Sequence, residues 1–271
     1  MIIKNQTFHE DGLYLMGILN VTPDSFSDGG RYTTLDAALY QAEKMVQEGA
    51  DLIDVGGEST RPGHAPVSVE QEIDRVVPVL EALRARFEVP LSLDTSKVKV
   101  AEAAVPFVDL INDVWGFRRE PALADLVARE HLSCCLMHNG EVPREKDFWT
   151  GFLEDVQTSL DLALTAGVPK ERILLDAGVG FAKTYEENLM VLQRTRQIKE
   201  LGYPVLIAAS RKSFIQKTLD RPLEERLPGT LAVTAWGAMQ GASFFRVHDV
   251  AANRDVLGMI RSLSEGKQWM P

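Results

Sequence analysis

The sequence predicts a (β/α)8 barrel, the TIM-barrel form of the α/β class, in which eight parallel strands alternate with helices. Eight short runs rich in Leu, Ile and Val are separated by longer segments with helical periodicity. Their starts lie about 33 residues apart, close to the roughly 31 expected when about 250 residues build eight units. The predicted strands span residues 14–21, 52–57, 91–95, 110–115, 134–138, 173–178, 205–210 and 244–249.

Helix-start signals lie in the segments between these runs. Ser68 and Thr184 each begin a capping box, in which paired side chains bond the free N–H groups of a first turn. Pro121 suits a first helical position. The helix after Ser68 places apolar residues three and four positions apart, and we expect this stripe to be buried against the barrel. The stripe consists of Ile73, Val76, Val77, Leu80 and Leu83.

The 271 residues are predicted to form a single domain, because no Gly/Ser-rich or Pro-rich linker and no shift in composition divides them. With 45% hydrophobic residues, the chain has enough apolar material for a large core. Residues 1–13 precede the first predicted strand. We expect them to form a short N-terminal extension, folded as a hairpin.

Charge and cysteine content exclude several classes of function. The net charge of −10 opposes binding to nucleic acid or to an anionic membrane. The only cysteines, Cys134 and Cys135, are neighbours in one predicted strand, so their side chains point to opposite faces and no disulfide framework exists. Residues 1–10 lack a signal-peptide pattern, and no stretch approaches 18 apolar residues. We therefore expect a reducing cytoplasm.

Polar residues gather at the carboxyl ends of the predicted strands, which form the active face of such a barrel. Burying them without partners would cost on the order of 1–3 kcal/mol each, so a ligand that supplies the partners is the simplest explanation. These residues are Asn20, Glu58, Ser59, Thr60, Arg61, Asp94, Asn112, His138, Asp176, Lys212, Arg246 and His248.

The residue types indicate a small ligand with two unlike ends. Asp94, Asn112 and Asp176 suit the N–H-rich edge of a flat heterocycle, because they offer acceptor oxygens. A second group suits an oxyanion such as phosphate. It comprises Asn20, Arg61, Lys212 and Arg246.

Structural alternatives remain open for single residues. Asp94 can equally be a helix N-cap or an ion-pair partner, since Thr95-Ser96-Lys97 follows it. His138 and His248 can be structural histidines, and Met137 can be a core residue. The histidine and cysteine spacing shows no zinc pattern. Long polar loops at 22–33 and 58–67 suit lids over a reactive intermediate, or are simply surface loops.

Residues 20–30 (NVTPDSFSDGG) and 54–63 (DVGGESTRPG) resemble the paired signatures of the dihydropteroate synthase family. The resemblance continues through 92–97, 111–116, 210–213 and 246–249, and so spans nearly the whole chain. It implies a pterin-binding barrel that joins a dihydropterin methyl diphosphate to 4-aminobenzoate in folate biosynthesis, releases diphosphate and uses Mg²⁺. A homodimer, sulfonamide binding and a dissociative, SN1-like loss of diphosphate without a protein nucleophile are also expected.

The same resemblance implies roles for individual residues. Asn20 matches the residue associated with Mg²⁺, and Asp28, Lys212, Arg246 and His248 match catalytic positions. The pterin diphosphate positions are Thr60, Asp94, Asn112, Met137, Asp176, Lys212, Arg246 and His248. The 4-aminobenzoate positions are Phe26, Thr60, Arg61, Pro62, Phe181 and Ser213.

The chain departs from the family pattern after the sixth predicted strand. Ala177 stands where the family usually has proline, and Ala182 where it usually has glycine. The stiffness of this turn is expected to differ, with the reaction class unchanged. A pterin-dependent methyltransferase and a non-catalytic pterin-binding paralogue remain the alternative functions.

Overall fold

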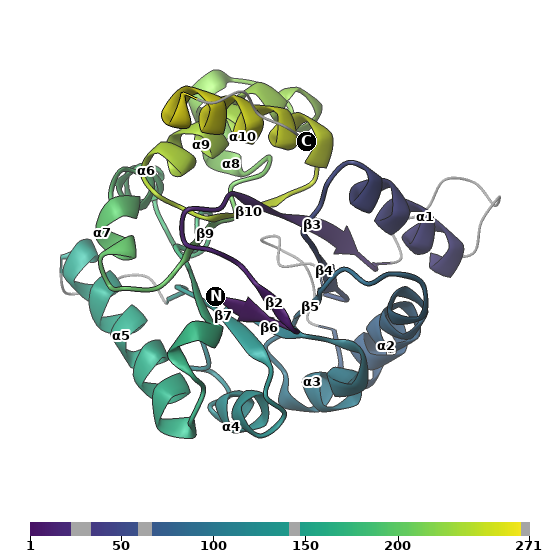
Figure 1. Cartoon of the computed structure of the whole chain (residues 1–271). Coiled ribbons are helices and arrows are strands. Elements are labelled where there is room, and N and C mark those ends of the chain that lie inside the picture. Colours follow the sequence, from purple (N-terminus) through teal and green to yellow (C-terminus); the bar gives the residue numbers. More distant parts are fainter. Residues whose placement is uncertain (23–33, 59–66, 141–146, 267–271) are drawn as a thin grey trace.

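A computed structural model of the chain describes residues 1–22, 34–58, 67–140 and 147–266. Its eight parallel strands close into a barrel with the order β10-β3-β4-β5-β6-β7-β8-β9, and the helices surround it (Figure 1). The predicted (β/α)8 fold is therefore confirmed. The barrel strands are β3 (Tyr14–Asn20), β4 (Leu52–Gly56), β5 (Leu91–Asp94), β6 (Leu110–Asp113), β7 (Ser133–Met137), β8 (Ile173–Asp176), β9 (Val205–Ile207) and β10 (Phe244–Val247).

All eight strands end one to three residues earlier than predicted. Polar side chains at the rim explain two of these early ends, because they bond backbone groups that would otherwise continue the sheet. Asp176 Oδ1 accepts from Gly178 N at 2.8 Å, and Asp113 Oδ1 accepts from Trp115 N at 3.0 Å. Such Asx turns direct the chain out of the strand and into the loop.

The helices form the outer layer, and both predicted capping boxes are present. Pro121 lies one residue before its helix and not at the first helical position. The helices are α1 (Thr34–Gln47), α2 (Val69–Arg86), α3 (Val98–Ala104), α4 (Ala122–Arg129), α5 (Phe148–Ala166), α6 (Tyr185–Gln193), α7 (Thr195–Lys199), α8 (Ser213–Leu219), α9 (Leu227–Met239) and α10 (Val250–Glu265). Short 3₁₀ helices η2 (Val105–Phe107), η3 (Lys170–Arg172) and η4 (Leu223–Glu225) connect some of them.

The buried face of α2 differs in part from the predicted stripe. Val76, Leu80 and Leu83 are buried as expected, but Ile73 and Val77 are only partly buried against the core. The buried set includes Val79 and Glu72 instead. Glu72 is buried because it bonds polar groups at the end of β5, which a pattern of apolar residues cannot show.

The barrel interior has an apolar end and a polar end. Alternate residues of a strand share one face, so each strand contributes inward-facing side chains at successive levels. The level nearer the amino ends of the strands, called the lower level, is apolar. It forms a cluster around Met16, Leu52, Leu110, Cys135, Leu174, Leu206 and Phe244. Two residues further along the same strands lie Asp54, Asn112, Asp176 and Arg246. The polar level lies toward the carboxyl ends, where the sequence placed the site.

The N-terminal segment forms the expected hairpin of β1 (Ile2–Ile3) and β2 (Gln6–Thr7), which lies across the barrel in Figure 1. Ile3 and Phe8 belong to the lower interior cluster. The centroid of the Phe8 ring lies 4.8 Å from that of Tyr14 and 5.5 Å from that of Phe244. Ser133 Oγ also donates to the Ile2 carbonyl at 2.6 Å. The hairpin therefore closes the amino-terminal end of the barrel.

Candidate active site

An ion-pair network occupies the polar level of the barrel. Arg246 Nε donates to Asp54 Oδ2 at 2.6 Å, and Arg246 Nη2 donates to Asp94 Oδ2 at 2.7 Å. Asn112 Nδ2 donates to the same Asp54 oxygen at 3.0 Å. The side chains of Asp54, Asp94 and Arg246 are 0%, 9% and 14% exposed. Four strands thus converge on one buried cluster, which unites three of the predicted site residues.

The network leaves three side-chain acceptor oxygens unused among the described residues. Asp94 uses Oδ2 for Arg246, Asn112 uses Nδ2 for Asp54, and Asp176 uses Oδ1 for Gly178 N. Within the described ranges, Asp94 Oδ1, Asn112 Oδ1 and Asp176 Oδ2 have no hydrogen-bond partner. Three acceptors from neighbouring parts of one barrel match a ligand edge that carries several N–H donors.

Burial changes the pKa values of the charged groups. It raises the pKa of Asp94 to about 7, although the Arg246 guanidinium opposes this increase. It also raises the pKa of Asp176, against the Gly178 N–H bond and the charges of Lys212 and Arg246. Burial alone would lower the pKa of Arg246, but Asp54 and Asp94 outweigh it and raise that pKa. Arg246 therefore stays charged, whereas Asp94 changes its protonation near neutral pH.

A cavity of about 350 Å³ opens beside Asp94 along the carboxyl ends of the strands. It is bordered by Phe181 after β8, Asn139 after β7, and Trp115 and Arg119 after β6. Its walls mix charged, amide and aromatic groups, as expected for a small-molecule site. The cavity lies on the side of the barrel predicted from the sequence.

His248 follows β10 and Lys212 follows β9, and a salt bridge joins their two loops. Asp249 accepts from Arg211 Nη2 at 2.6 Å and from Arg211 Nε at 3.0 Å. Ser210 Oγ accepts from His248 N at 3.2 Å and lies 2.9 Å from Nδ1. If the Ser210 hydroxyl hydrogen points to Nδ1, then Nε2 carries the imidazole hydrogen. The loops after the last two strands therefore hold His248 and Lys212 on one side of the mouth.

Lys212 Nζ lies 4.1 Å from the centre of the Phe181 ring, which brings two predicted binding residues into contact. A cation over an aromatic face is stabilised by the ring quadrupole. Ser213 is exposed at the first position of α8. Met137 is 3% exposed and pairs in register with Asp176, so it lies on the inner face of β7.

Asn20 ends β3 and is half-buried. A Cβ on Gly56 would lie 3.8 Å from Asn20 Oδ1 and 3.6 Å from Asp94 Oδ2, so the two oxygens flank the same glycine. Among the described residues, no cluster of three or more His, Cys, Asp or Glu side chains has the arrangement of a metal site. Any cation held here would depend on a few protein oxygens together with ligand oxygens.

Two of the structural alternatives are decided. Asp94 is an ion-pair partner of Arg246 and not an N-cap, because Lys97 precedes α3 and Glu120 Oε2 accepts from Val98 N at 2.7 Å. His138 is structural: it is 2% exposed, its Nδ1 lies 2.8 Å from Lys183 Nζ, and its Nε2 lies 3.3 Å from Asp155 Oδ2.

Both cysteines are free and fully buried on opposite faces of β7, as the sequence predicted. Burial raises the pKa of each thiol. Neither thiol therefore has the features of a nucleophile at neutral pH.

Six predicted residues lie outside the described residues: Phe26, Asp28, Ser59, Thr60, Arg61 and Pro62. Most of the two predicted lid loops, 22–33 and 58–67, also lies outside them. Glu58 and Val67, the residues that flank 59–66, are described, and Lys97 bonds both of them. Its Nζ bonds Glu58 Oε2 at 2.5 Å, the Val67 carbonyl at 2.8 Å and Glu72 Oε2 at 2.6 Å. Although burial opposes the charge, these carboxylates raise the pKa of Lys97. Sequence reasoning missed this role, since Lys97 resembles an ordinary residue before a helix.

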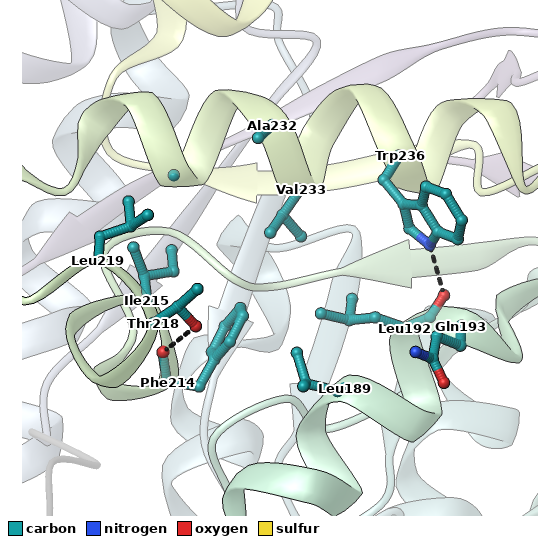
Figure 2. A pocket seen from close by; sticks show the side chains of 11 residues that line it. Leu189, Leu192, Gln193, Phe214, Ile215, Thr218, Leu219, Ala232, Val233 and Trp236 are labelled. Atoms are coloured by element: carbon teal, nitrogen blue, oxygen red, sulfur yellow. Dashed lines mark hydrogen bonds between the residues drawn. The ribbon is translucent and has the colours of Figure 1, made fainter.

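A second cavity, of about 340 Å³, lies outside the barrel between α6, α8 and α9 (Figure 2). Leu189, Phe214, Ile215, Val233 and Trp236 line it, and Trp236 Nε1 donates to the Leu192 carbonyl at 3.0 Å. This surface is apolar and has none of the charged groups of the barrel mouth. In the part of the chain that the structure describes, no helix meets the length and hydropathy needed to cross a membrane.

Comparison with known proteins assigns the chain to a family. The model of a family described as pterin binding enzymes matches residues 16–248. The dihydropteroate synthase of Clostridium beijerinckii is 50% identical over 89% of this chain and 90% of its own length. The chain belongs to the pterin-binding enzymes and, among them, to the dihydropteroate synthases.

Other relatives agree with this assignment. A dihydropteroate synthase from Bacillus subtilis is 46% identical over 89% of this chain and 85% of its own length. A crystal structure of the Clostridium difficile enzyme in the presence of pteroic acid has a TM-score of 0.92 and 43% identity, and it covers 95% of this chain and 99% of that one. The Xanthomonas albilineans enzyme with 4-aminobenzoic acid has a TM-score of 0.90 and 42% identity, over 94% of both chains.

The protein is therefore an enzyme, a transferase of the dihydropteroate synthase type that acts in folate biosynthesis. This assignment favours the synthase over the methyltransferase and the non-catalytic paralogue. The family resemblance stated from the sequence motifs is confirmed.

Proposed function

We propose that the barrel mouth condenses (7,8-dihydropterin-6-yl)methyl diphosphate with 4-aminobenzoate to give 7,8-dihydropteroate and diphosphate. The observation that carries this proposal is the placement of three open acceptor oxygens beside Arg246 at the carboxyl end of the barrel. The acceptors fit the N–H groups of a dihydropterin, and the cations fit its diphosphate. No other site among the described residues pairs these two chemistries.

The pterin ring would lie against Asp94, Asn112 and Asp176, with Met137 below its plane. Asp176 would take the donor-rich end of the ring, since its Oδ1 accepts from Gly178 N and its Oδ2 has no partner among the described residues. Lys212 would approach the ring from the Phe181 side. Arg246 bonds Asp54 and Asp94, and it would stack on the ring and contact the diphosphate.

Loss of diphosphate would precede attack by the amine. An aryl amine is a weak nucleophile, so the larger gain comes from stabilising charge that develops as the C–O bond breaks. Arg246 and His248 would hold the departing oxygens, with the Nε2 hydrogen of His248 as a donor. The carboxylates of Asp94 and Asp176 would stabilise the positive pterin-methyl group, which supports a dissociative, SN1-like displacement.

Mg²⁺ fits the oxygen donors at the end of β3. In phosphate sites this ion takes one or two protein oxygens together with phosphate oxygens, and Asn20 Oδ1 is a hard donor beside Asp94. Bound there, the ion would supply positive charge to the diphosphate. Asn20 would hold it, and Arg246 and His248 would share the anionic group with it.

4-Aminobenzoate would bind at the outer part of the mouth, next to Phe181 and Ser213. Phe181 is half-buried and contacts Lys212, so it offers an aromatic wall beside the pterin position. Phe26, Thr60, Arg61 and Pro62 would complete this subsite, with Asp28 on the first loop. The same subsite would bind sulfonamides; the Yersinia pestis enzyme has been crystallised with a sulfonamide drug.

A coupled assay tests the reaction directly. The purified protein should release diphosphate only when both substrates and Mg²⁺ are present, and EDTA should stop the release. Continued release over many turnovers with the pterin substrate alone would indicate a hydrolase, because water would then replace the amine. No release under any combination would overturn the proposal.

We also propose a cytoplasmic homodimer. The free, buried cysteines agree with a reducing compartment. Exposed apolar side chains on α8 and α9, including Leu219, Trp236 and Met239, support self-association on that side. Sedimentation should give twice the chain mass, and a monomer at every concentration would contradict the dimer.

A further inference from the structure

Asp54 is the one fully buried carboxylate that touches two of the proposed ligand-binding residues among those described. It accepts from Ser92 Oγ at 2.5 Å, from Asn112 Nδ2 at 3.0 Å and from Arg246 Nε at 2.6 Å. It is fully buried and does not border the cavity beside Asp94. Its influence on a ligand must therefore act through its partners.

The first partner is Asn112, whose amide has two unlike ends. A carboxylate paired with Arg246 only accepts hydrogen bonds, so Asp54 selects the Nδ2 end of the amide. Oδ1 is then left as an acceptor, and the second Nδ2 hydrogen points away from Asp54. Without Asp54, the amide could rotate and present either end to the mouth.

The second partner is Arg246, whose guanidinium is a rigid planar fork. One edge bonds Asp54 and the other bonds Asp94. A ligand that takes Asp94 competes with Arg246 for this carboxylate. The ligand would not compete for Asp54, so the bond from Arg246 Nε to Asp54 would hold the guanidinium in place while Asp94 changes partners.

We propose that Asp54 is a positioning residue for pterin recognition: it fixes Asn112 as an acceptor and retains Arg246 when the ligand engages Asp94. This inference rests on the proposed function and adds a residue that does not touch the substrate. It also narrows the ligand class, because the atom that meets Asn112 Oδ1 must carry a hydrogen.

A double-mutant cycle separates this role from simple support of the fold. Binding of 6-hydroxymethylpterin is measured by calorimetry for the wild type, Asp54→Asn, Asn112→Ala and the double variant. We expect Asp54→Asn to weaken binding roughly 10-fold or more, the scale of a charge-assisted hydrogen bond. In the Asn112→Ala background, the fold-loss of affinity caused by Asp54→Asn should be smaller by a factor of about three or more. Additive effects would overturn the inference.

Asp109→Asn is the matched control. Asp109 is also a carboxylate bonded to an arginine, Arg84, and to a backbone N–H, that of Leu91, but it precedes β6 at the opposite end of the barrel. The control should lower the melting temperature while the pterin affinity stays within twofold. An equal loss of affinity in the control would mean that Asp54→Asn reports only on the fold, and would overturn the positioning role.

A crystal structure of the wild-type protein with 6-hydroxymethylpterin decides the matter if Asp54→Asn does not fold. An N–H of the ring should lie at hydrogen-bond distance from Asn112 Oδ1, with Asn112 Nδ2 and Arg246 Nε still on Asp54. A ring acceptor facing that oxygen, or an Asp54 without these two bonds, would contradict the inference. A wild-type protein that binds no pterin would refute the proposed function itself, whereas binding with an additive cycle would refute only the role of Asp54.

Discussion

The two ends of the barrel interior are built from the same strands and differ in what holds them together. At the amino-terminal end, apolar side chains of the barrel pack against Ile3 and Phe8 of the hairpin. At the carboxyl end, Asp54 and Arg246 lie two residues further along their strands and form a buried ion-pair network with Asp94. A period of two residues thus separates a packed core from a site.

The difference shows where stability and function reside. Apolar burial stabilises the lower end without a ligand, since dispersion and removal of water need no partner of opposite charge. A buried ion-pair network contributes little net stability, because desolvation offsets the attraction. The upper end is therefore best explained by what it binds, and substitutions at the two ends should have different effects.

Arg246→Ala should have the largest effect, because it leaves two buried carboxylates without their cation. We expect a loss of about 3–5 kcal/mol in the free energy of unfolding at pH 8, together with loss of diphosphate release that exceeds any loss of 4-aminobenzoate binding. Urea unfolding and the coupled assay measure both. Arg221→Ala is the control, because its pair with Glu225 is exposed and should contribute about 0.5 kcal/mol or less. A variant defective only toward 4-aminobenzoate would contradict the role of Arg246.

Ile3→Ala tests the lower end. Ile3 is fully buried, so its truncation should cost about 2–4 kcal/mol of unfolding free energy. The affinity for 6-hydroxymethylpterin should not change at a temperature where the variant is folded. A selective loss of pterin affinity in a folded variant would mean that the two ends are coupled.

Asp176→Asn tests a single acceptor at the upper end. The substitution should weaken pterin binding by roughly 1–3 kcal/mol, the scale of a hydrogen bond that involves a charged group. The unfolding free energy should change less than in Ile3→Ala, because the change removes a buried charge rather than packing. Unchanged affinity in calorimetry would argue against the assigned role of Asp176.

Pterin binding should also depend on pH through Asp94. Since burial raises its pKa to about 7, this carboxyl gains a proton as the pH falls from 8 to 6 and then accepts less well. Affinity should therefore decrease over this range, and Asp94→Asn should bind weakly with a smaller pH dependence. The folded state holds this proton more tightly than the unfolded chain does, so the Asp94 contribution to stability increases as the pH falls through 7 toward 4. Affinity that increases on acidification would contradict this assignment.

Ala182→Gly should have the smallest effect and the opposite sign. Ala182 has a φ of 42°, in the left-handed region that favours glycine, where the family usually has glycine. Relief of this strain, reduced by the greater entropy of glycine in the unfolded chain, should stabilise the protein by about 0.5–1 kcal/mol. Thermal unfolding measures the change, and a lower melting temperature would show that the turn is not strained.

Much of this organisation could be predicted from local patterns. The spacing of the apolar runs predicted eight strands, and the capping boxes at Ser68 and Thr184 predicted two helix starts. Polar residues at strand ends predicted the site at the carboxyl face. The buried face of α2 was predicted less accurately, since Ile73 and Val77 fit the apolar period but are only partly buried.

Long-range pairs were not predictable in the same way. Arg246 is 192 positions from Asp54 in the sequence, and only closure of the barrel brings them together. Asp54 stood inside a recognised motif without a role of its own, and Lys97 was missed because its three partners come from other elements. A contact of this kind depends on strand register, which single-sequence patterns do not determine.

A crystal structure with a non-hydrolysable pterin diphosphate analogue tests the division between the two ends most directly. The ring should lie against Asp94, Asn112 and Asp176, with the diphosphate on Arg246 and His248 and the lower apolar cluster unchanged. A ring bound elsewhere, for example in the second, apolar cavity between α6, α8 and α9, would contradict the assignment of the upper end as the pterin site.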